Sequence, residues 1–141
     1  MWIGGEYLEQ GLFPPFEARL MMLIVSQHIA FTFDSLEDLF VAYRQRKAKG
    51  MVPYWCVNHG MTISLYYKDP DGNVLETQVD VFAENDEADE YMLSPAFARN
   101  PIGVDFDPEE FIGRIAAGES RERLTYRPDI GPRGVDTIPR L

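Results

Sequence analysis

The sequence has one cysteine, few basic residues and no long apolar run. Because Cys56 is alone, no disulfide can form within the chain, which argues against a disulfide-rich secreted scaffold. Thirteen Lys and Arg stand against 23 Asp and Glu, a net charge of −10, which disfavours nucleic-acid and anionic membrane partners. The longest apolar run, 20–25, cannot span a bilayer. We therefore expect a soluble cytoplasmic protein that binds neither nucleic acid nor membrane.

The residues that are present are sufficient for one folded domain. The chain has 141 residues, of which 45% are hydrophobic and 13% aromatic, enough to bury a core. Glycine and proline cluster near both ends, where they interrupt regular elements. We expect an α+β fold with four parts: an irregular N-terminal arm at 1–22, a βαβββ module at 23–82, a helical extension at 83–119 and an irregular tail at 120–141.

Hydrophobic periodicity and capping residues predict the individual elements. Apolar residues at helical spacing follow Asp34 and Ser35, either of which is a good N-cap, and Gly50 is suited to the helix end. The sequence Asp-Pro-Asp-Gly-Asn at 69–73 is a strong turn signal between two alternating segments. The resulting prediction is a strand within 21–33, a helix at 35–49, strands at 53–57, 62–68 and 74–80, and helices at 86–93 and 108–117.

The predicted strands each have an apolar and a polar face. If Lys68 pairs with Val74 across the turn, Tyr66 lies opposite Glu76, with side chains about 5 Å apart. His28 lies on the small or polar face of the first strand, with Ile29 on the other. We expect the apolar faces to meet a helix and the polar faces to line the opposite, concave side.

Four segments of the chain resemble a known family. They are HIAFTF at 28–33, NHG at 58–60, SLYYKDPDGN at 64–73 and VLETQVD at 74–80. Together they resemble the vicinal oxygen chelate superfamily, which includes glyoxalase I, bleomycin-resistance proteins and extradiol dioxygenases. The likeness is greatest to the small proteins related to biphenyl-2,3-diol 1,2-dioxygenase, and it continues more weakly to Gly118.

The resemblance implies a fold and a chemistry. The fold is one βαβββ half of a two-module cupped barrel around a metal, with C-terminal helices added. By residue matching, His28 and Glu76 are metal ligands for Fe(II) or Mn(II), while His59 and Tyr66 are catalytic residues near the substrate. The implied activity is extradiol cleavage of a catechol-like small aromatic diol.

The sequence departs from this family before its first matching segment. The residues before His28 contain no histidine, so we expect the first module and its metal ligand to be missing. We therefore expect an impaired isolated chain and a homodimer that compensates for the missing module. A triad of His28, His59 and Glu76 is also arithmetically possible. The alternative function is a non-catalytic or truncated binding module without a complete metal site, and Cys56 is expected to be a core residue.

Overall fold

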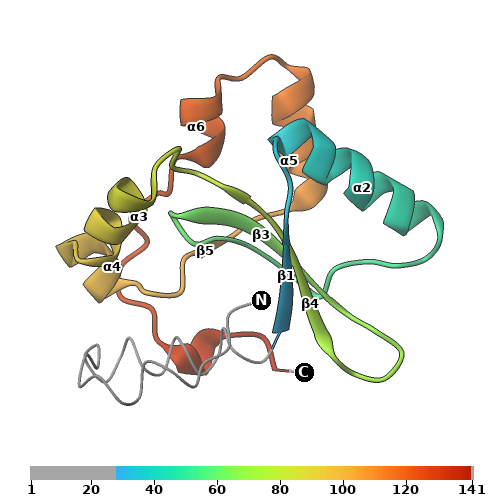
Figure 1. Ribbon diagram of the computed structural model, residues 1–141, viewed down its shortest axis with the longest axis horizontal. Coiled ribbons are helices and arrows are strands. Elements are labelled where there is room, and N and C mark those ends of the chain that lie inside the picture. Colours follow the sequence, from blue (N-terminus) through green and yellow to red (C-terminus); the bar gives the residue numbers. More distant parts are fainter. Residues whose placement is uncertain (1–27, 141) are drawn as a thin grey trace.

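Five strands form one mixed sheet in the part of the chain that the computed structural model describes, residues 28–140 (Figure 1). The strand order is β1-β4-β3-β2-β5; β1 runs parallel to β4, and the other neighbours are antiparallel. The strands are β1 (His28–Thr32), β2 (Trp55–Asn58), β3 (Thr62–Lys68), β4 (Val74–Asp80) and β5 (Val104–Asp105). The α+β class is confirmed. The predicted arm at 1–22 and residues 23–27 of the predicted module lie outside the described residues.

Helix α2 (Leu36–Ala48) forms where its capping residues and apolar spacing predict it. The Ser35 side chain accepts a hydrogen bond from the Asp38 backbone N–H at 3.1 Å, and Gly50 follows the helix with a φ of +79°. Its four buried residues, spaced three or four apart, form one stripe: Leu36, Leu39, Phe40 and Tyr43. Burial of this stripe fixes α2 on the sheet.

The hairpin of β3 and β4 has the register predicted from its turn. Lys68 pairs with Val74, and Tyr66 therefore lies opposite Glu76. The Asp69 carboxylate holds the turn by accepting hydrogen bonds from the backbone N–H groups of Asp71 and Asn73 at 2.9 and 2.7 Å. Side chains that share a face are thereby fixed along both strands.

The two faces of the sheet carry separate cores. On one face, Leu65, Ile63 and Val79 pack against α2 and α5 (Pro108–Ala116), which Figure 1 shows on the same side as α6 (Arg121–Thr125). On the other face, a smaller aromatic cluster forms from Trp55, Val57, Tyr66 and Ile102, with Tyr54, Val74 and Ile138 packed around it. The second face carries the polar residues considered below.

The apolar face of β1 differs from expectation. Ile29 and Phe31 were expected to be covered by the helix, but their exposed fractions are 59% and 53%. The reason is topological, because β1 forms one edge of the described sheet and α2 packs over its centre.

The segment after β4 contains more structure than predicted. Helix α3 (Asn85–Met92) and helix α5 agree with expectation, and Asp107 caps α5 through the backbone N–H groups of Glu109 and Glu110. Helix α4 (Pro95–Arg99) and strand β5 were not predicted. Both are too short to show periodicity.

The expectation of an irregular tail at 120–141 was wrong in two places. Helix α6 and a 3-10 turn, η2 (Val135–Thr137), interrupt it. Ser120 caps α6 by accepting from the Arg123 N–H, and Leu124 is buried in the core under α5. The glycines and prolines of this segment lie outside α6, which begins after its Ser120 cap and ends before Pro128. Among the helices at 28–140, none combines the length and apolarity required to cross a membrane.

Candidate active site

His28 and Glu76 are paired on the face of the sheet opposite α2. In the parallel ladder, His28 aligns with Val74 and Ala30 with Glu76, so the histidine is diagonal to the glutamate on the same face. The Nε2 atom of His28 is 2.6 Å from Oε2 of Glu76, and the two side chains are 5% and 6% exposed. The pair is therefore a buried, charge-assisted hydrogen bond.

The carboxylate of Glu76 stays ionised although it is buried. Burial pushes its pKa upward, but hydrogen bonds from His28 and Ser64 outweigh burial and hold the pKa below its usual range. A fixed negative charge therefore lies beneath the second face of the sheet.

Tyr66 lies between Glu76 and the next residue of the site, His59. Its ring lies across the ladder from Glu76, edge-on to His28 at 5.4 Å between centroids. Burial, and then the charge and a hydrogen bond of Glu76, raise the pKa of the Tyr66 hydroxyl far above its usual value. The phenol therefore remains protonated and acts as a donor.

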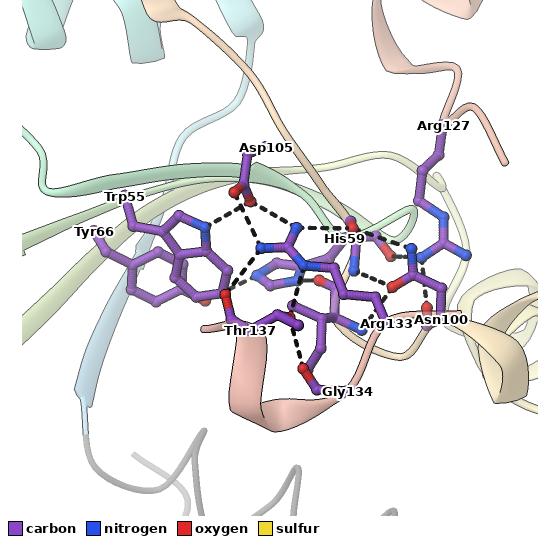
Figure 2. A network of polar contacts seen from close by, with 11 residues as sticks. Trp55, His59, Tyr66, Asn100, Asp105, Arg127, Arg133, Gly134 and Thr137 are labelled. Atoms are coloured by element: carbon purple, nitrogen blue, oxygen red, sulfur yellow. Dashed lines mark hydrogen bonds and ion pairs between the residues drawn. The ribbon is translucent and has the colours of Figure 1, made fainter. Parts of the chain in front are cut away.

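His59 completes a continuous polar chain. Its Nδ1 atom lies 2.5 Å from the Ile102 carbonyl oxygen, and its Nε2 atom lies 3.0 Å from the Tyr66 hydroxyl (Figure 2). A carbonyl can only accept, so Nδ1 carries the proton and Nε2 accepts from Tyr66. Burial lowers the pKa of His59 below 6.5, outweighing the opposite effect of the Glu76 charge. His59 is therefore neutral at pH 7.

The backbone around His59 is held by chain that comes much later in the sequence. The Asn58 side-chain amide donates to the Thr125 carbonyl at 3.0 Å, and its oxygen accepts from the Gly60 N–H at 2.8 Å. Arg127 donates to the carbonyls of Asn100 at 2.8 Å and His59 at 3.4 Å. The segment expected to be an irregular tail thus forms part of the site's support.

The structure brings together all four residues singled out from the sequence, but it adds others that sequence reasoning missed. Trp55, Asp105 and Arg133 lie beside Tyr66 and His59 in Figure 2. No periodic pattern marks them, because they come from an all-buried strand, a two-residue strand and a glycine- and proline-rich segment.

The donor set for a metal is incomplete in residues 28–140. No group of three His, Cys, Asp or Glu side chains there is arranged to hold a metal ion. The triad of His28, His59 and Glu76 is therefore not formed, since both nitrogens of His59 are engaged with Ile102 and Tyr66. His28 and Glu76 together offer two donor side chains, fewer than the three that a non-haem Fe(II) oxygenase site needs.

Cys56 is separate from this site. It is a buried free thiol in the helix-covered core, as expected from the sequence. Burial, followed by the charges of Asp107 and Asp105, raises its pKa from 9.0 to about 12. It is therefore suited to packing and not to nucleophilic chemistry.

Comparison with known proteins identifies two similar chains, both from Rhodococcus globerulus. The chain is 47% identical over 98 residues to a protein named biphenyl-2,3-diol 1,2-dioxygenase 2, covering 70% of this chain and 52% of that protein. It is 43% identical over 100 residues to biphenyl-2,3-diol 1,2-dioxygenase 3, covering 71% of this chain and 53% of that protein. No family model and no solved structure matches.

The chain spans about half the length of these curated relatives. At this identity, the shared segment is too long and too similar to be coincidental. The two likenesses support a relationship to the extradiol dioxygenases of the vicinal oxygen chelate type.

Proposed function

We propose that this chain carries one half of an extradiol ring-cleaving site and acts on a catechol-like aromatic diol with Fe(II) or Mn(II). The observation that carries the proposal is the buried polar chain from His28 through Glu76 and Tyr66 to His59. The names of the two relatives supply the reaction and the substrate class. The βαβββ order fits one module of the vicinal oxygen chelate fold.

In this proposal, His28 and Glu76 are two metal ligands, and a third comes from outside residues 28–140. A metal in such a site would bind the diol oxygens and activate oxygen. Two ligands hold a divalent ion weakly, because affinity rises with ligand number and preorganisation. We therefore expect impaired metal binding in the isolated chain.

The roles of His59 and Tyr66 follow from their protonation states. The neutral His59 ring can accept a proton at Nε2, where the Tyr66 hydroxyl now donates. Tyr66 stays protonated and donates its proton to His59, so its oxygen can accept a hydrogen bond from a bound diol hydroxyl. A proton leaving the diol would pass through Tyr66 to His59.

We propose a second copy of the chain as the source of the third ligand. β1 lies at one edge of the described sheet, and its Ile29 and Phe31 are more than half exposed. An exposed apolar edge strand is a pairing surface. We propose a homodimer through this edge. Sedimentation of the wild type and of Phe31→Glu tests it, with a dimer expected for the wild type and a monomer for the variant. A monomeric wild type contradicts the proposal.

One observation favours the alternative, a non-catalytic binding module. His28 and Glu76 already satisfy each other in a buried pair, so the fold does not depend on a metal to neutralise the carboxylate. In that case the same face binds an aromatic diol without turning it over.

Metal titration and a ring-opening assay separate the two functions. Fe(II) is titrated anaerobically into the wild type, Glu76→Gln and Tyr66→Phe, and biphenyl-2,3-diol with oxygen is then followed by absorbance. The ring-cleaving proposal expects metal binding that weakens in Glu76→Gln and persists in Tyr66→Phe, with turnover falling about 100-fold or more in Tyr66→Phe. Tight binding that survives Glu76→Gln contradicts the ligand assignment. Diol binding without turnover supports the alternative.

A further inference from the structure

Trp55 contacts both members of the His59–Tyr66 pair. It lies opposite Tyr66 in the β2–β3 ladder, and the two rings stack with centroids 4.9 Å apart and an interplanar angle of 21°. The same indole meets the His59 ring edge-on at 5.6 Å and 88°. One buried side chain therefore limits the movement of two rings whose hydrogen bond is central to the site.

The indole is itself fixed from its other edge. Its Nε1–H donates to Oδ1 of Asp105 at 2.8 Å. Arg133 then donates to both Asp105 oxygens, from Nη1 at 2.7 Å and from Nη2 at 3.0 Å (Figure 2). Such a two-pronged pair fixes geometry as well as charge.

Arg133 is also tied to the chain around it. Its Nη1 donates to the Gly103 carbonyl at 3.0 Å and its Nε to the Thr137 hydroxyl at 2.9 Å, and only 10% of its side chain is exposed. Ile138 packs on the cluster that contains Trp55 and Tyr66. The segment at 133–138 therefore lies against the site and is attached to β5.

We infer that Trp55 is a positioning residue for the His59–Tyr66 pair, and that the Asp105–Arg133 ion pair holds it in place. Nδ1 of His59 is fixed by the Ile102 carbonyl, so the length of the other hydrogen bond depends on where the Tyr66 ring lies. Stacking by Trp55 fixes that ring. The catalytic consequence rests on the proposed function, whereas the geometric consequence does not.

The test measures the His59–Tyr66 hydrogen bond directly in the full chain. Long-range proton–nitrogen NMR spectra of the ¹⁵N-labelled protein report the Nε2 resonance of His59, assigned with His59→Gln because the chain has two histidines. Tyr66→Phe defines the position of this resonance without the hydrogen bond. The test variants are Trp55→Phe, which keeps a ring but loses the N–H donor, and Arg133→Met, which removes the ion pair.

The matched control is Arg114→Met. Arg114 also makes a two-pronged ion pair, with Glu119 at 2.6 and 3.1 Å, but on the helix-covered side of the molecule. We expect Trp55→Phe and Arg133→Met to move the Nε2 resonance at least halfway toward its Tyr66→Phe position, and Arg114→Met to leave it in place. Arg133→Lys keeps the positive charge but loses the two-pronged hydrogen bonding. Its Nε2 resonance should therefore lie between the wild-type position and the Arg133→Met position.

The inference is overturned if Arg133→Met folds and its Nε2 resonance coincides with that of the wild type, or if Arg114→Met moves it equally. Arg133 decides the outcome if Trp55→Phe does not fold. In a ring-opening assay, kcat should fall about 10-fold or more in Arg133→Met with KM little changed. A wild type without turnover would reject the proposed function, while the NMR result would still decide the role of Trp55.

Discussion

His28 on β1 and Glu76 on β4, 48 residues apart in sequence, share a hydrogen bond of 2.6 Å, and both side chains are buried. Because β1 pairs with β4 at the sheet edge, this contact joins the first described strand to the rest of the site. The pair therefore has a structural role in attaching β1 to β4.

Replacing Glu76 by Gln should lower the free energy of unfolding by about 1–3 kcal/mol, because the buried bond to His28 loses its charge. Urea denaturation followed by circular dichroism measures this. The matched control is Glu90→Gln, which changes an exposed carboxylate in α3 and should shift the stability by less than about 0.5 kcal/mol. Equal effects of the two changes would contradict the structural role of the pair.

Stability should fall as the pH drops below 6.5. Burial lowers the pKa of His59 in the folded state, so as the pH falls the unfolded chain takes up a proton at this residue first. This protonation stabilises the unfolded state relative to the folded state. The contribution of His59 is complete above pH 6.5 and is lost toward its lower folded pKa, at up to about 1.4 kcal/mol per pH unit. Denaturation between pH 7 and 5 should be steeper for the wild type than for His59→Gln, and parallel curves would be incompatible with a buried neutral His59.

Cys56 should react slowly with thiol reagents in the native protein. Its pKa of about 12, compared with 9.0 ordinarily, reduces the thiolate fraction about 1,000-fold at neutral pH, and burial adds a steric barrier. The single cysteine makes the measurement specific. Labelling with a chromogenic disulfide should be fast in urea and slow in buffer, and fast labelling in both would place Cys56 outside the core.

Gly60→Ala should destabilise the protein more than Gly72→Ala. Both glycines have a positive φ, +92° and +86°, so each substitution carries a backbone cost of about 1–2 kcal/mol. Only at Gly60 would the added Cβ also approach Tyr91, 2.1 Å from its hydroxyl oxygen. Thermal denaturation of both variants isolates this contact.

The double variant Gly60→Ala/Tyr91→Ala provides a check on that explanation. The Tyr91→Ala change removes the clashing ring, so adding Gly60→Ala to it should cost no more than Gly72→Ala costs in the wild type. A larger cost in the double variant would show that the backbone at 58–60, and not Tyr91, sets the requirement for glycine.

Local signals predicted the part of the site that lies on the hairpin. The Asp-Pro-Asp-Gly-Asn turn fixes the register of its two strands, and this register alone places Tyr66 opposite Glu76. Strand alternation placed His28 on the polar face of its strand, and the resemblance to a known family added His59 and the roles of both histidines. Their roles as ligand and acid or base stay predictions.

The remaining part of the site depends on contacts that leave no local signal. Asp105 lies in a strand of two residues, and Arg133 lies in a segment with glycines and prolines on either side. The role of each residue depends on its ion pair with the other, which lies 28 residues away in sequence. The sequence shows that Asp105 and Arg133 have opposite charges, but it does not show that they form an ion pair beside Trp55.

The support of the loop at 58–60 by residues 125–127 has a consequence for biosynthesis. The ribosome completes β2, β3 and β4 before it synthesises Thr125 and Arg127, so the sheet can assemble while this loop still lacks its later contacts. A nascent chain arrested near residue 120 would present a formed hairpin with a loosely held imidazole. The geometry of the site is therefore completed late, after the sheet that carries it.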